Sequence, residues 1–154
     1  MIITILTLLS ILMLSVYITY SYKMGGVPDS LSGTVYLTRL PKLFTLTMWT
    51  IGFLMMLVMV EVSDNLQWLA FISMMSLFGV GCTPLYKTEH GFAHYTCAII
   101  AGLGSQIVVA ANAPIYLSLW IVYIAYAIML WNKNWLFWMQ MTGISITFAY
   151  CLAQ

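Results

Sequence analysis

Charged side chains are scarce in this sequence: only 6% of its 154 residues are Asp, Glu, Lys or Arg, whereas 63% are hydrophobic. An ordinary soluble domain is about a quarter charged and about half apolar, so this chain has too few charges to cover a water-facing surface. Its formal net charge of +1 comes without a basic stripe, which excludes nucleic acid as a partner. The composition therefore predicts a protein that is surrounded by lipid.

Signals for secretion and for a disulfide framework are also missing. The three cysteines, Cys82, Cys97 and Cys151, are an odd number without the spacing of a metal site, so no disulfide framework is expected. The first apolar run, from Ile2 to Tyr22, has no basic residue before it and no small-residue cleavage pattern after it. We therefore expect a retained first membrane crossing and not a signal peptide.

Long apolar runs take the place of the missing charge. Six of them follow one another, separated by short polar breaks, and a helix needs about 20 apolar residues to cross a bilayer. The expected crossings are residues 2–22, 43–62, 66–85, 92–111, 114–131 and 135–153. Breaks this short force neighbouring helices to run antiparallel. The predicted fold class is all-α, a single transmembrane domain over residues 1–154 built as a polytopic bundle of six helices.

Basic residues are confined to one set of breaks. With six crossings, the breaks after the first, third and fifth lie on one side of the membrane. They hold every Lys and Arg of the sequence, namely Lys23, Arg39, Lys42, Lys87 and Lys133. The opposite side receives the acidic residues Glu61 and Asp64. Because basic residues concentrate in cytoplasmic loops, we expect a cell-membrane protein with both termini outside the cytoplasm.

The polar segment after the first crossing, residues 23–42, contains a short amphipathic stretch. Pro28 ends the preceding helix, and Asp29 or Ser30 is expected to cap a new one through its side-chain oxygen. The new helix is expected to be interfacial, with its apolar residues on lipid and its polar residues in water. The lipid-facing residues would be Leu31, Val35 and Leu37, and the water-facing ones Ser32, Arg39 and Lys42.

This segment has two interpretations. As a functional element it is a hydroxyl-rich cap over the cytoplasmic mouth of the bundle. Its candidate binding residues are Ser30, Ser32, Thr34, Tyr36 and Arg39. As a structural element it is a capped connector with an anchoring basic end, and capping chemistry alone accounts for most of its residues.

Both histidines of the sequence lie in a second segment, residues 79–95. If the fourth crossing begins near Glu89, then His90 and His94 lie one turn apart on one face, a usual spacing for two metal ligands. Zinc needs at least three protein ligands, and only Glu89 or Cys82 is near enough in sequence to be the third. Two imidazoles on one face cannot bind opposite sides of a haem, which excludes bis-histidine haem. We expect no metal and no other cofactor.

The preferred interpretation of these histidines is structural. His90 is expected at the membrane interface, and His94 is expected to hydrogen-bond inside the bundle, because an imidazole facing lipid leaves its nitrogens unsatisfied. The expected partners of His94 are Tyr36, Thr83 and the backbone freed by Pro84. The candidate binding residues of this segment are Glu89, His90, His94 and Tyr95.

The fourth crossing is rich in small residues. Ala98/Gly102 and Ala101/Ser105 are small-x-x-x-small pairs that let helix backbones approach closely, so we expect this helix at the centre of the bundle. Gln106, on the same helix, is a further candidate binding residue. Ionisable groups deep in the bilayer are the usual mark of ion-coupled transport, and their absence favours lipid or small neutral ligands over a charge-driven pump.

Two short motifs carry a resemblance. They are Pro-x-Ser-Leu-Ser-x-Thr-x-Tyr, from Pro28 to Tyr36, and Gly-x-x-Pro followed by His-Tyr-x-x-Ala, at Gly81, Pro84, His94, Tyr95 and Ala98. Together they resemble a group of small uncharacterised six-span membrane proteins of gut bacteria and their phages, which implies no established activity. The second motif is more distantly similar to the intramembrane hydrolase superfamily that includes alkaline ceramidases. That superfamily uses three histidines with an aspartate and a serine, and this sequence has two histidines.

Three functions are compatible with these features. The favoured one is a non-enzymatic membrane protein whose cytoplasmic mouth binds a ligand, lipid or partner. The first alternative is a channel or small-molecule transporter acting as an oligomer of this chain, which neutral helix surfaces permit. The second alternative is a metal-dependent intramembrane lipid hydrolase. Membrane lipid and further copies of the chain are the expected partners.

Overall fold

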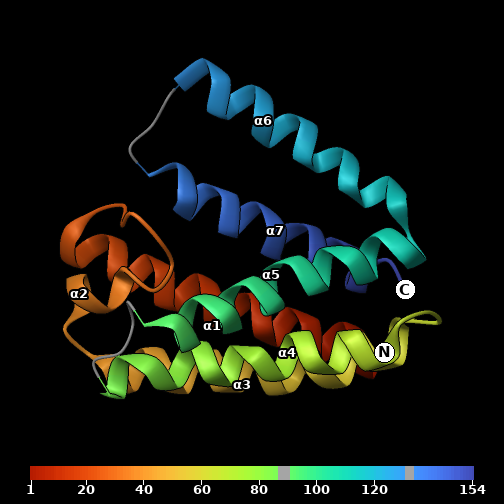
Figure 1. Cartoon of the computed structure of the whole chain (residues 1–154), viewed down its shortest axis with the longest axis horizontal. Helices are drawn as coiled ribbons and strands as arrows, with labels where there is room; N and C mark the ends of the chain where they lie inside the picture. The colour runs from red at the N-terminus through yellow and green to blue at the C-terminus, as the bar shows by residue number, and fades with distance from the viewer. Residues whose placement is uncertain (87–90, 131–133) are drawn as a thin grey trace.

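The computed structural model describes residues 1–86, 91–130 and 134–154, and these residues are helical with no strand. The α-helices are α1 (Ile2–Gly25), α2 (Thr34–Thr38), α3 (Pro41–Val62), α4 (Gln67–Cys82), α5 (Phe92–Asn112), α6 (Leu119–Leu130) and α7 (Trp135–Leu152). Two 3₁₀ helices, η1 (Thr83–Tyr86) and η2 (Pro114–Ser118), join α4 and α6 to their neighbours. The prediction of an all-α fold is confirmed (Figure 1).

The helices follow the apolar runs because lipid offers no partners for backbone N–H and C=O groups, which must then pair within a helix. The polar breaks end them. At the end of α1, Gly26 adopts φ 83°, a left-handed conformation that costs glycine nothing, and Pro28 cannot continue the helix. Pro41 stands at the first position of α3, where its missing N–H would be unpaired in any residue.

Four helical stretches are long and apolar enough to cross a membrane: α1, α3, α4 together with η1, and α5. This is the composition of a helical membrane protein. The regions of the expected fifth and sixth crossings are shorter or more polar. The fifth begins as the 3₁₀ helix η2 before α6, and α7 has 18 residues that include Gln140 and several hydroxyl side chains.

The two ends of the molecule differ in charge. Figure 1 places both termini at one end and α2 at the other, where α1 ends and α3 begins. Lys23, Arg39 and Lys42 belong to this α2 end together with the acidic Asp29. Glu61, in the last turn of α3, and Asp64, in the turn between α3 and α4, belong to the opposite end. Two further basic residues, Lys87 and Lys133, lie outside the described residues. The described basic residues thus lie at one end of the bundle, and two of the three described acidic residues lie at the other.

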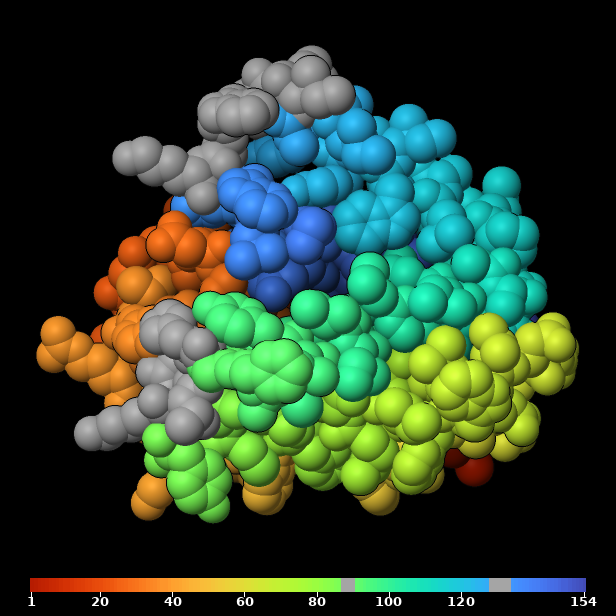
Figure 2. All heavy atoms as spheres, in the orientation of Figure 1, coloured from red at the N-terminus to blue at the C-terminus, as the bar shows by residue number. Residues whose placement is uncertain are grey.

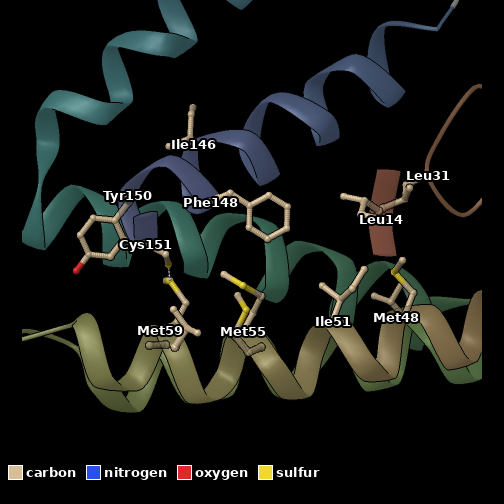
Figure 3. Packing of buried hydrophobic residues seen from close by; sticks show 14 of the residues in the cluster. Leu14, Leu31, Met48, Ile51, Met55, Met59, Ile146, Phe148, Tyr150 and Cys151 are labelled. Carbon is tan, nitrogen blue, oxygen red and sulfur yellow. Dashed lines mark hydrogen bonds between the residues drawn. The ribbon is translucent and has the colours of Figure 1, made fainter. Parts of the chain in front are cut away.

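The most buried of the long apolar helices is α3. Just over half of its apolar window, 56%, is buried inside the protein, compared with 33% for α5. In Figure 3 the methionines of α3, including Met55 and Met59, face Phe148 and Cys151 of α7. The fourth crossing, α5, which was expected at the centre, lies between α4 and α7 in Figure 1 but is less buried than α3. The small residues of α5 serve mainly one close contact, with α4, and do not surround the helix with neighbours.

That close contact depends on two glycines. A Cβ at Gly104 of α5 would collide with the Ser73 side chain of α4, and a Cβ at Gly79 of α4 would collide with Cys97 of α5. Gly102, which was expected to share this role, faces open space. The helix pair α4–α5 is therefore held together at Gly79 and Gly104, which permit backbone approach on opposite sides of the contact.

Candidate functional site

The chain between α1 and α3 folds over one end of the bundle, and we call residues 26–40, which include α2, the cap. Hydrogen bonds within the cap shape it. The Thr34 hydroxyl donates to the Leu31 carbonyl at 2.6 Å and lies 2.8 Å from the hydroxyl of Tyr17 in α1. The Gly33 N–H donates to Ser30 Oγ at 3.1 Å. Thr34, fully buried, is therefore a structural link between the cap and α1.

The cap is also attached to α7. The Leu31 N–H donates to Gln140 Oε1 at 2.7 Å, and Asn134 Nδ2 donates to the Val27 carbonyl at 3.0 Å. Both bonds pair backbone groups of the cap that lie outside α2 and therefore have no partner within a helix. The cap therefore bridges α1 and α7, two helices that lie far apart in the sequence.

A short helix in the cap was predicted, but its predicted start and its predicted orientation are both wrong. It begins at Thr34 and has no side-chain cap, so neither Asp29 nor Ser30 caps it. The apolar side chains of Leu31 and Val35 are each 8% exposed and belong to the core, so the expected lipid-facing placement is wrong. A helix of little more than one turn buries its apolar side against the nearest apolar surface, which here is the end of the bundle.

The other cap candidates lie on its outer side. Ser30 and Ser32 are half-buried with their hydroxyl oxygens 3.3 Å apart, and Tyr36 and Arg39 are exposed. The structure thus brings the five predicted cap residues onto one element. Only Thr34 among them also lines the cavity beneath it.

That cavity has a volume of about 400 Å³ and lies between the end of α1, the cap and the start of α7. Its walls include Ser21, Pro28, Thr34 and Trp138. A second cavity of about 280 Å³ continues from it along α1 and α7, and both are lined by Ile18 and Thr19. We call the two together the α1–α7 groove. In Figure 2 the blue residues of α7 lie between the orange residues near the cap and the cyan residues of α6.

His94 occupies the interior of the bundle near the same end. It is 4% exposed, and its Nδ1 lies 2.7 Å from Thr83 Oγ1. Thr83 Oγ1 also lies 2.9 Å from the Val80 carbonyl oxygen, so this hydroxyl joins the imidazole to the backbone at the end of α4. The prediction that His94 faces inward with a protein partner is confirmed, and Thr83 was one of the three partners expected.

The neighbours of His94 in the predicted site are placed only in part. Tyr95 is exposed and meets the imidazole edge-on, with ring centroids 5.8 Å apart. Glu89 and His90 lie outside the described residues. Within the described part of the chain, no three His, Cys, Asp or Glu side chains are grouped closely enough to hold a metal ion.

Gln106 joins three helices. Its Nε2 donates to the Gly143 carbonyl at 3.0 Å and to Thr147 Oγ1 at 3.2 Å, both in α7. Its Oε1 accepts from Trp120 Nε1 of α6 at 3.0 Å. Both amide hydrogens and the oxygen are therefore bonded to protein. This arrangement fits a packing role, away from the cap and from the α1–α7 groove.

Several residues of the groove were not candidates at the level of sequence. From the sequence alone, Ser21 does not differ from other hydroxyl residues in an apolar helix, and Trp138 is expected to be an interfacial anchor. These residues line the groove because α1 packs against α7, and no local sequence pattern predicts that contact. No known protein family, characterised protein or solved structure shows significant similarity to this chain.

Proposed function

We propose that this chain is a cell-membrane protein of six crossings that binds a membrane lipid in the α1–α7 groove, beneath a cytoplasmic cap. Residues 114–130, which form η2 and α6, and the 18 residues of α7 are within the range of about 17–25 residues that crosses a bilayer. The concentration of Lys23, Arg39 and Lys42 at the α2 end supports a cytoplasmic position for the cap.

The observation that carries the proposal is the groove itself. It combines about 400 Å³ under the cap with about 280 Å³ farther along the helices. Its described walls are apolar side chains interspersed with hydroxyls, and no charged side chain lines them. Concave apolar surfaces with a few convergent polar groups are typical of ligand sites, and these walls suit a neutral or zwitterionic amphiphile.

The position of the groove favours a lipid over a water-soluble ligand. Only 22% of the apolar window of α1 is buried, so this helix is at the outside of the bundle. Ser15, Thr19 and Ser145, which line the groove, are exposed. A molecule diffusing within the bilayer can therefore enter from the side. The exposed rings of Tyr22 and Trp135 suit the membrane interface at the same end.

Native mass spectrometry of the protein released from phospholipid nanodiscs tests the proposal. Thr19 lines both cavities, so Thr19→Trp should fill their junction and strongly reduce the lipid retained per protein. Val16→Trp is the matched control, because Val16 is exposed on the same helix and does not line the groove. Equal lipid retention by the two variants would contradict the proposal.

A further inference from the structure

Many hydroxyl side chains in the long helices donate to the backbone carbonyl four residues earlier. Thr50 donates to Leu46 and Ser76 donates to Ile72, each at 2.8 Å. This local bond is the usual way in which a hydroxyl is satisfied in an apolar helix. Thr50 and Ser76 are only half-buried, so the bond forms near the helix surface as well as in the core.

Three hydroxyls of the α1–α7 groove are not satisfied in this way. Ser15 and Thr19 of α1 and Ser145 of α7 make no hydrogen bond with any residue that the structure describes. All three side chains are exposed and line the second cavity, so their hydroxyls are open to a molecule in the groove. Hydrocarbon offers a hydroxyl no partner, and leaving it unpaired there costs free energy. These positions therefore call for a ligand with hydrogen-bonding atoms.

The three hydroxyls belong to two walls of one cavity. The described walls of the second cavity come from α1 and α7 alone, and Ser145 is the hydroxyl residue of the α7 wall. Ser15 and Thr19 are four residues apart, so their Cβ atoms lie about 5–6 Å apart on one face of α1. A ligand in this cavity therefore meets hydroxyls on both sides and at separate positions, which suits more than one acceptor atom.

The depth of these hydroxyls narrows the class of ligand. Ser15 lies ten residues before the end of α1 at Gly25, and Ser145 lies ten residues after the start of α7 at Trp135. In the six-crossing arrangement proposed above, a rise of about 1.5 Å per residue places both about 15 Å from the cap end, near the middle of a hydrocarbon core of about 30 Å. The phosphate and ester groups of a phospholipid stay at the interface and do not reach this level.

The walls of the second cavity also exclude a charged headgroup. No charged side chain lines them, so an ion would be buried without a counter-charge. The hydroxyls can donate to acceptor oxygens. The ligand must therefore be an uncharged lipid that carries acceptor oxygens into the hydrocarbon core. An isoprenoid quinone has this chemistry, because its flat, uncharged ring bears carbonyl oxygens on opposite sides and its tail is a hydrocarbon.

We infer that the α1–α7 groove binds an isoprenoid quinone with its ring in the second cavity. One carbonyl oxygen accepts from the α1 wall, at Ser15 and Thr19, and the other accepts from the α7 wall, at Ser145. The isoprenoid tail continues into the cavity under the cap, which Thr19 joins to the second cavity. This inference rests on the proposed lipid-binding function and adds the class of lipid and the side chains that recognise it.

The test offers the protein three lipids in one membrane. Nanodiscs of phosphatidylcholine carry ubiquinone and diacylglycerol at equal, low mole fractions, and native mass spectrometry identifies by mass the lipids that the released protein retains. Diacylglycerol is uncharged like the quinone, but its oxygens belong at the interface. We expect ubiquinone to be retained in preference to both other lipids, and Thr19→Trp to abolish its retention.

Variants test the hydroxyls. Ser15→Ala combined with Thr19→Val removes those of the α1 wall, and Ser145→Ala removes that of the α7 wall. Each change should weaken ubiquinone retention about threefold, and all of them together about tenfold, because each wall loses one hydrogen bond to the ligand. Ser76→Ala is the matched control, because it removes a helix hydroxyl that donates to Ile72 and does not line the groove. Alanine and valine keep these exposed helix positions apolar, so the variants should fold.

The outcomes separate this inference from the proposed function. Retention of phosphatidylcholine or diacylglycerol in preference to ubiquinone, with displacement by Thr19→Trp, would overturn the quinone and leave the lipid site standing. Ubiquinone retention that is unchanged in the hydroxyl variants would overturn the assigned recognition. Retention of none of the three lipids above the level of Thr19→Trp would overturn the lipid-binding function and this inference with it.

Discussion

The backbone N–H of Leu31 donates to the side-chain oxygen of Gln140 at 2.7 Å, so that a residue of α7 completes the hydrogen bonding of the cap. Leu31 is itself buried, and its N–H would otherwise lack a partner in an apolar setting. The shape of the cap therefore depends on a helix that follows it by about 100 residues in the chain.

Gln140→Met keeps the length of the side chain and removes the acceptor. We expect the free energy of unfolding in mixed micelles to fall by about 1–3 kcal/mol, and the Leu31 amide to exchange its hydrogen faster. Thr142→Val, which loses only a bond to Trp138 within α7, is the control. Unchanged exchange at Leu31 in Gln140→Met would show that this bond does not hold the cap.

His94→Ala should destabilise the bundle by about 1–3 kcal/mol, because it removes the buried hydrogen bond between His94 and Thr83 and opens space. Thr83→Val should cost a similar amount. Since the two residues share one bond, the double variant should cost less than the sum of the single ones. Tyr95→Ala, an exposed neighbour, is the control. Strictly additive losses would contradict the pairing.

The same preparations allow the metal hypothesis to be examined. Elemental analysis of the unmodified protein is expected to find no stoichiometric zinc. Zinc that is present in the parent and lost in His94→Ala would instead support the metal-dependent hydrolase.

The two glycines of α5 predict opposite effects of one substitution. Gly104→Ala places a methyl group against Ser73 and should cost about 1–3 kcal/mol of stability. Gly102→Ala meets open space and should stabilise the helix by up to about 1 kcal/mol. The free energies of unfolding of both variants are the measurement. Adding Ser73→Gly to Gly104→Ala should restore most of the loss, and a loss that persists would place the strain elsewhere.

Membrane sidedness can be tested with reporter fusions. A reporter that is active only in the cytoplasm should be inactive after Gln154 and active when inserted in the cap, between Ser30 and Arg39, because the cap end carries the described basic residues. Activity after Gln154 together with activity in the cap would contradict an even number of crossings, and activity after Gln154 without activity in the cap would contradict the orientation.

Most of the helices could be predicted from the sequence, because lipid forces an apolar run to satisfy its own backbone and because Gly26, Pro28 and Pro114 mark breaks. The inward position of His94 followed from the same reasoning about unsatisfied nitrogens. The orientation of the cap could not be predicted, because the apolar side chains of Leu31 and Val35 are equally compatible with facing lipid and with packing against the bundle.

The groove was beyond sequence reasoning for a different reason. Two residues that line it, Ser21 and Trp138, come from helices that are distant in the chain and are brought together only by tertiary packing. Gln106 shows the same limit. A buried side-chain amide needs hydrogen-bond partners within the bundle, but no local sequence pattern identifies Trp120 or Gly143 as those partners.

The pairing of α1 with α7 has a consequence for biosynthesis. The cap is joined to α7 by the bond from Asn134 to Val27, which spans 107 residues, so one wall of the groove enters the membrane long after the other. Until α7 is inserted, the Leu31 N–H and the apolar side of α1 face lipid or the insertion machinery. The proposed lipid site is therefore complete only after α7 has been inserted, because α1 and α7 each supply one of its walls.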